Sequence, residues 1–169
     1  MQTNGTGYLR QPFKLIREAD PQLFKTMQAT YWPVLTANWE EMAISLIHAG
    51  MNFQDALMQS NDYRETALGV TLLPMDGRTE PKEDLDFATF INREHISEIV
   101  EGSGMNEVNL VAATLVHEFV HRQGESNEDP AYSAGSAFAM KIDDLQVYMA
   151  SEMGRHQAAA MGLMEGTVI

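Results

Sequence analysis

Two histidines and a glutamate in the stretch HEFVH carry the chemistry that this sequence suggests. Residues i and i+4 of an α-helix project from the same face, so the imidazoles of His117 and His121 can share one metal ion. Glu118 lies beside the pair, where it can take a proton from a water instead of binding the metal. The H-E-x-x-H pattern therefore predicts a Zn²⁺ site with Glu118 as general base.

The residues around this stretch predict that it belongs to a buried helix. Apolar side chains cover most of the helix circumference between residues 110 and 120. Asn106 is expected to cap the start of this helix, and Gly124 to follow its last turn. Buried imidazoles without partners are costly, and a metal ion would supply the missing partner. The alternative is a pair of structural histidines that bond to carbonyls or to each other.

A catalytic zinc ion usually has three protein ligands, so two histidines are not enough. The sequence contains no cysteine, which leaves His, Asp or Glu as the third ligand. Acidic candidates follow closely in Glu125, Glu128 and Asp129, with Glu152 further along. The long-helix zinc peptidases place a histidine six residues after the second histidine of the motif, but Asn127 stands there in this sequence.

The segment 129–132 (DPAY) contains a D-x-x-Y element downstream of H-E-x-x-H. It resembles the corresponding element of the aspzincin peptidases, which include the deuterolysins and the lysine-specific metalloendopeptidases. The match covers this element but not the glycines that flank it in that family. The resemblance implies that His117, His121 and Asp129 bind zinc, that Glu118 is the general base and that Tyr132 stabilises the oxyanion.

Other interpretations of these residues stay open. In the compact gluzincin arrangement a glutamate at the start of the next helix is the third ligand, which favours Glu128 or Glu152. Asp129 directly precedes Pro130 and would also make a good N-cap for a helix that begins there. Tyr132 is also compatible with a half-buried place in the core.

The sequence predicts an α+β fold, namely a mostly helical zincin-like domain with a small β-sheet before the motif helix. This single domain is expected to span residues 1–169, with residues 1–11 irregular. Helices are expected over 12–30 with a break at Asp20-Pro21, over 35–49, 53–59 and 94–101, and over 130–153, with a last helix after 154. Strands are expected over 66–73 and 87–92, joined by a loop over 74–86. By analogy with zincins, strand 87–92 is the candidate edge along which a substrate would bind.

Composition limits the possible partners. The formal net charge is −13 and the pI is about 4.6. Nucleic acids and anionic membranes both require an excess of Lys and Arg, so neither is expected as a partner. Residues 1–11 do not resemble a signal peptide, and no apolar run reaches the roughly 18 residues that a spanning helix needs.

Together these features predict a zinc-dependent metallopeptidase that acts on a protein or peptide substrate. The alternatives are a non-proteolytic protein with a structural zinc ion and a zinc amidase that cleaves cell-wall amide bonds. Small size, absent cysteines and the lack of a signal peptide resemble bacterial effector or toxin peptidases. That setting implies a protein that is cytoplasmic in its producer and secreted by a specialised route, with a secretion-system carrier or an immunity protein as partner.

Overall fold

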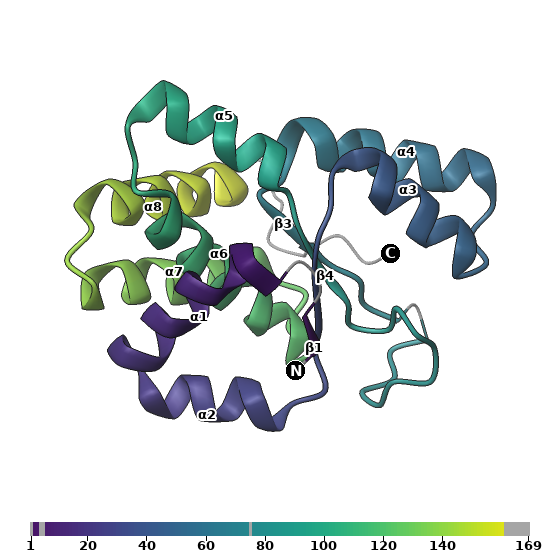
Figure 1. Cartoon of the computed structure of the whole chain (residues 1–169), viewed down its shortest axis with the longest axis horizontal. Helices are drawn as coiled ribbons and strands as arrows, with labels where there is room; N and C mark the ends of the chain where they lie inside the picture. Colours follow the sequence, from purple (N-terminus) through teal and green to yellow (C-terminus); the bar gives the residue numbers. More distant parts are fainter. Residues whose placement is uncertain (1, 4–5, 75, 161–169) are drawn as a thin grey trace.

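The computed structural model describes residues 2–3, 6–74 and 76–160 (Figure 1). Helices dominate the described chain, and the expected α+β class is confirmed. The elements follow in the order β1 (Gln2–Thr3), α1 (Thr6–Ala19), α2 (Pro21–Ala29), β2 (Pro33–Thr36), α3 (Trp39–His48), α4 (Phe53–Thr66), β3 (Gly69–Thr71), β4 (Thr89–Ile91), α5 (Arg93–Ser103), α6 (Glu107–Arg122), α7 (Glu128–Lys141) and α8 (Leu145–Ala160).

The strands form one sheet in the order β1-β2-β4-β3. β1 runs parallel to β2 and β2 runs parallel to β4, whereas β3 is antiparallel to β4. The prediction that strand 87–92 forms an edge for substrate is wrong, because β4 is hydrogen-bonded to a neighbour on each side. The outer strand next to β4 is β3, which arises from the predicted strand 66–73.

The two faces of the sheet pack against different helices. Phe90 contributes to a buried cluster with residues of α3 and α4, whereas the next residue, Ile91, contributes to a cluster with α1, α5 and α6. This alternation follows from the two-residue period of a strand, and both faces are covered (Figure 1). On β3 the same period directs Val70 to the α3 and α4 side and leaves Gly69 and Thr71 on the side of α6.

Helix α6 lies at the centre of the larger cluster. It packs against α1, α5, α7, α8, β3 and β4, and most of its residues from Leu110 to Arg122 are buried. As predicted, the Asn106 side chain caps it by accepting a hydrogen bond from the Asn109 amide at 3.1 Å. Gly124 follows its end with φ of +94°, a conformation that L side chains rarely adopt. The helix is thus defined by local caps and held by contacts on nearly every side.

Two boundaries in the N-terminal half differ from the predictions. The described residues within 1–11 are not irregular, because Gln2–Thr3 form a strand and α1 begins at Thr6. Leu9 is buried one turn before Phe13, so the apolar stripe of α1 starts earlier than predicted. The segment 35–49 is not all helix either, since β2 extends to Thr36 and α3 begins only after the Asn38 cap. The predicted break at Asp20-Pro21 is confirmed.

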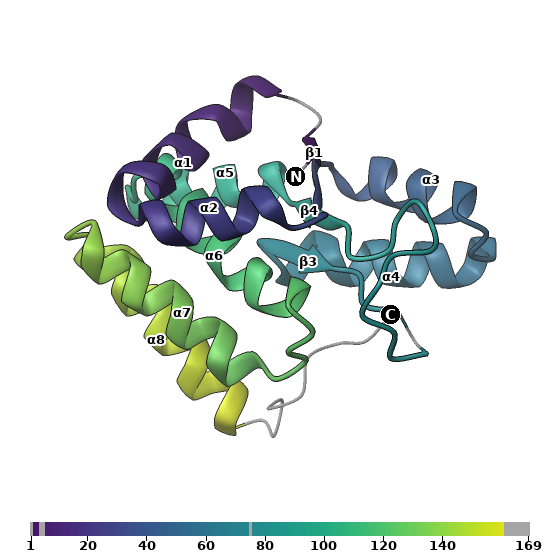
Figure 2. The same ribbon diagram turned by 90° about the horizontal axis from the view of Figure 1, so that it is seen from below.

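In the C-terminal half, the predicted helix 130–153 is two helices, α7 and α8, which lie side by side in Figure 2. Asp143 adopts a positive φ of 54°, and the Asp144 side chain accepts a hydrogen bond from the Val147 amide at 3.0 Å. Aspartates tolerate the left-handed conformation and cap helices, which explains the turn. The last helix expected after residue 154 is the end of α8, and residues 161–169 lie outside the described residues. The loop over 74–86 is confirmed for its described residues.

Asn92 connects three elements from a buried position. Its side-chain amide donates to the carbonyl oxygens of Tyr63 at 2.8 Å and Ala67 at 3.1 Å, near the end of α4. Its side-chain oxygen accepts from the His95 amide at the start of α5. The same residue therefore caps α5, donates to two carbonyls at the C-terminal end of α4 and directly follows β4.

We expect Asn92→Ala to lower the free energy of unfolding by about 2–3 kcal/mol, because it removes the cap of α5 and the amide that donates to the carbonyl oxygens of Tyr63 and Ala67. Urea denaturation would measure this loss. Asn106→Ala is the matched control, since it removes only a cap on the exposed end of α6 and should cost about 1 kcal/mol. Equal losses in the two variants would contradict the role given to the buried amide.

Candidate metal centre

His117 and His121 lie on the same face of α6, as the motif predicts. Their Nε2 atoms are 3.2 Å apart and their ring centroids 5.0 Å apart. Nδ1 of His121 lies 2.7 Å from the carbonyl oxygen of Glu125, just beyond the end of α6. A carbonyl can only accept, so Nδ1 carries a proton, and whenever the ring is neutral its Nε2 lone pair faces His117. Metal-binding histidines usually have such a second partner.

The third member of the cluster is Glu128, at the start of α7. Its Oε2 is 3.3 Å from Nε2 of His117, and its Oε1 is 3.5 Å from Nε2 of His121. Two ligands at about 2.1 Å from a tetrahedral zinc ion lie about 3.4 Å apart. The spacing among these three side chains therefore fits one zinc ion, and among the described residues they alone form such a group.

The other acidic candidates point elsewhere. Asp129 Oδ1 accepts a hydrogen bond from Arg155 Nε at 2.7 Å, in an ion pair between α7 and α8. Glu125 Oε1 accepts from the Asn127 amide at 2.9 Å, and Glu152 lies 3.6 Å from the Arg155 guanidinium. The geometry thus favours Glu128, one of the alternatives left open by the sequence, over Asp129.

Asp129 is not the cap of the following helix. The cap is Asn127, whose side chain accepts a hydrogen bond from the Asp129 amide at 2.8 Å. Because α7 begins two residues earlier than predicted, Glu128 stands in its first turn and faces the histidines. Neighbouring residues on a helix point about 100° apart, so Asp129 is directed away from them.

Glu118 lies beside the cluster and outside the group of three donors. It is 3 % exposed, and its Oε2 accepts a hydrogen bond from the Thr71 hydroxyl of β3 at 2.7 Å. Its Oε1 lies 4.0 Å from Nε2 of His117. The carboxylate therefore has one oxygen fixed by β3 and the other next to the possible metal position, as expected of a general base.

Tyr132 lies in the wall of the site. Its ring centroid is 4.6 Å from that of His117, with an interplanar angle of 73°. On its other side it packs on Gly154 of α8, where an added Cβ would come within 2.4 Å of the ring. Burial and the nearby carboxylates of Glu128 and Glu118 raise the pKa of Tyr132, so its hydroxyl stays protonated and able to donate.

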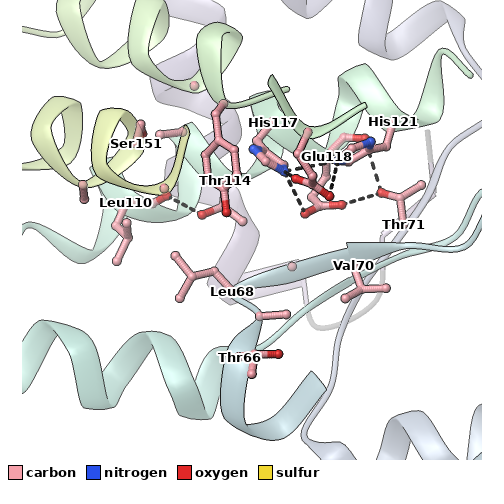
Figure 3. Close-up of a pocket in the computed structure, with 18 of the residues that line it drawn as sticks. Thr66, Leu68, Val70, Thr71, Leu110, Thr114, His117, Glu118, His121 and Ser151 are labelled. Atoms are coloured by element: carbon pink, nitrogen blue, oxygen red, sulfur yellow. Dashed lines mark hydrogen bonds and ion pairs between the residues drawn. The ribbon is translucent and has the colours of Figure 1, made fainter. Parts of the chain in front are cut away.

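These residues line a pocket of about 580 Å³ between β3, α6, α7 and α8. In Figure 3 the His117, Glu118 and His121 side chains gather at one end, close to Thr71. Leu68, Leu110 and Thr114 lie toward the other end, and the Thr114 hydroxyl is already bonded to the Leu110 carbonyl. The pocket thus joins a polar, metal-competent end to a mainly apolar recess.

The sequence alone did not reveal the contributions of β3 and α8 to the site. Gly69 and Thr71 are two residues apart and so share one face of β3. That spacing was visible in the sequence, but which face meets α6 depends on pairing with β4. Gly154 and Ser151 reach the pocket only because α8 turns back along α7.

His121 and Glu128 strongly affect each other's protonation. Burial alone would lower the pKa of His121, but the hydrogen bond that its ring donates to Glu128 and the charges of Glu118 and Glu128 outweigh burial and raise the pKa to about 9. Burial likewise opposes the charged form of Glu128, yet hydrogen bonds from both histidines lower its pKa to about 2. Without a metal, the cluster is held by a protonated histidine and a carboxylate.

Comparisons with protein-family models, with curated proteins and with solved structures found no match. No helix in the described part of the chain is long and apolar enough to cross a membrane.

We expect Glu128→Gln to weaken zinc binding more than about 100-fold, because even the loss of a residue that only supports a ligand costs 10–100-fold. Asp129→Asn is the matched control and should bind zinc like the parent protein, since its partner is Arg155. Competition with a chromophoric chelator would measure both affinities. Loss of zinc from Asp129→Asn but not from Glu128→Gln would reverse the choice of third ligand.

We expect the metal-free protein to keep His121 protonated up to a pH of about 9. A raised histidine pKa contributes stability that is complete below its ordinary value of 6.5 and is lost as the pH rises through 9. Histidine resonances followed by NMR would report this titration. In Glu128→Gln the pKa of His121 should fall, because the main partner of the cation is gone, and an unchanged pKa would contradict the proposed coupling.

Proposed function

We propose that this protein is a zinc-dependent metallopeptidase in which His117, His121 and Glu128 hold the metal and Glu118 is the general base. The observation that carries this proposal is the spacing of the three donor groups, 3.2 to 3.5 Å, next to a buried glutamate. A glutamate at the start of the helix after H-E-x-x-H resembles the compact gluzincin arrangement.

Each residue of the site has a separate role in the proposed hydrolysis. A zinc ion bound here would lower the pKa of a water and polarise the carbonyl of the substrate. Glu118 takes the proton of the attacking water through its Oε1 side and passes it to the leaving amine. Tyr132, beside His117, is the candidate donor to the oxyanion that forms on the substrate.

The pocket supports a catalytic role more than a structural one. Structural zinc sites are usually closed by four protein ligands, whereas catalytic sites have three and an open position. Here three ligands face a pocket of about 580 Å³. A second, non-proteolytic role for the same ion has no comparable observation in its favour.

The substrate that fits this site is an extended peptide. β3 is the outer strand beside β4 and lines the pocket from Gly69 to Thr71. A peptide can add to such a strand through main-chain hydrogen bonds, with alternate side chains directed into the pocket. The recess near Leu110 and Leu68 would then accept an apolar side chain.

We expect Glu118→Gln to retain zinc and to lose at least about 100-fold in the rate of peptide hydrolysis, since it removes only the general base. Incubation of the zinc-loaded protein with a random peptide library, followed by mass spectrometry, would measure cleavage. Glu98→Gln, on the exposed surface of α5, is the control and should cleave like the parent.

A parent protein that binds zinc but cleaves no peptide would contradict the peptidase proposal. Cleavage of peptidoglycan fragments in place of peptides would identify an amidase. Parental rates in Glu118→Gln would show that the glutamate is not the base.

A further inference from the structure

A line of buried hydrogen bonds runs from the core of the protein to Glu118. The indole Nε1 of Trp32 donates to Thr89 Oγ1 at 2.7 Å, and Thr89 Oγ1 lies 2.6 Å from Thr71 Oγ1. Thr71 Oγ1 is in turn 2.7 Å from Glu118 Oε2. All four residues are buried, with exposures of 0 % for Trp32 and Thr89, 5 % for Thr71 and 3 % for Glu118.

The two ends of this line fix the direction of every proton in it. An indole N–H can only donate, and an ionised carboxylate can only accept. Each threonine hydroxyl has a single proton. Thr71 therefore donates to Glu118 and Thr89 donates to Thr71, while Trp32 occupies an acceptor position on Thr89. The Thr71 hydroxyl also lies 3.3 Å from the Glu118 carbonyl oxygen, but the carboxylate is the nearer acceptor.

A second observation, the close approach of β3 to α6 at Gly69, also concerns the position of Glu118. A Cβ at this position would lie 2.9 Å from Glu118 Cγ, 3.0 Å from Glu118 Oε1 and 3.0 Å from Thr114 Cγ2. Only a glycine lets β3 approach α6 so closely without displacing the Glu118 side chain. The strand thus confines the carboxylate sterically at Gly69 and holds it by a hydrogen bond at Thr71.

We propose that Trp32, Thr89 and Thr71 form a directional hydrogen-bond chain that positions Glu118, holding Oε2 on β3 and leaving Oε1 toward the metal ligands. Thr71 is a positioning residue, and Trp32 and Thr89 act through it. This inference rests on the proposed function, because it explains how the general base is kept in place. The presence of the hydrogen-bond chain can be tested without measuring hydrolysis.

The structural test uses the two tryptophans. Trp39 lies on α3 and takes no part in the hydrogen-bond chain, so its indole N–H resonance is an internal reference for that of Trp32. We expect Thr71→Val and Glu118→Gln each to move the Trp32 indole resonance in ¹H–¹⁵N spectra, while that of Trp39 stays in place. Thr71→Ser should restore the Trp32 position. An unmoved Trp32 resonance in both Thr71→Val and Glu118→Gln would overturn the proposal.

The kinetic test uses a peptide that the parent cleaves. We expect Thr71→Val to lower kcat by about 10- to 100-fold with zinc content retained and KM within about twofold, as for other residues that orient a reacting group. Thr71→Ser should recover most of this loss because it keeps the hydroxyl. Ser60→Ala removes a buried hydroxyl of α4, bonded to Ala56, and should match the parent.

A second substitution in the hydrogen-bond chain keeps the proposal testable if Thr71→Val does not fold. Thr89→Val changes no residue that touches Glu118, and it should lower kcat with rescue by Thr89→Ser. Parental kcat in folded Thr71→Val or Thr89→Val would overturn the proposal. If the parent cleaves no peptide, the proposed function fails, and the Trp32 resonance alone tests whether the hydrogen-bond chain exists.

Discussion

The close approach of β3 to α6 is the contact on which the candidate site depends. Two helix residues, Thr114 and Glu118, meet a strand that has no side chain at Gly69. Two positions further along the same face, the Thr71 hydroxyl reaches the glutamate. A buried carboxylate is costly unless it is hydrogen-bonded, so this strand makes it possible for Glu118 to lie inside the protein. The pocket, its outer strand and the orientation of the glutamate all follow from this contact.

The turn after α6 is equally important for the ligands. Gly124 reverses the chain, the Glu125 carbonyl accepts from His121, and Asn127 starts α7. This short connection places Glu128 opposite the two histidines. The packing of α7 and α8 then adds Tyr132 to the wall of the pocket, with Gly154 leaving space for its ring.

The sequence predicted the local features and missed those that depend on pairing. The motif helix, its Asn106 cap and its end at Gly124 could be predicted, because each depends on residues within a few positions. The choice between Glu128 and Asp129 could not be predicted, because it depends on whether Asn127 or Asp129 caps the next helix. The proposed roles of Trp32, Thr71 and Thr89 arise from the pairing of β2 and β3 with β4, which joins segments far apart in the chain. The edge strand was misassigned for the same reason, since the residues of a strand do not show which strands will pair with it.

The proposed ligands all lie in one continuous stretch of chain, from His117 to Glu128, and this locality has a thermodynamic consequence. Closing a short loop costs less chain entropy than joining distant segments, and here the helix and the turn have already done so. The donor groups come together where α6 packs against α7. Small zinc domains, in contrast, fold only when the metal binds. On the proposed function, this fold would provide a preformed receptor, in which metal loading and release are separate from the folding of the chain.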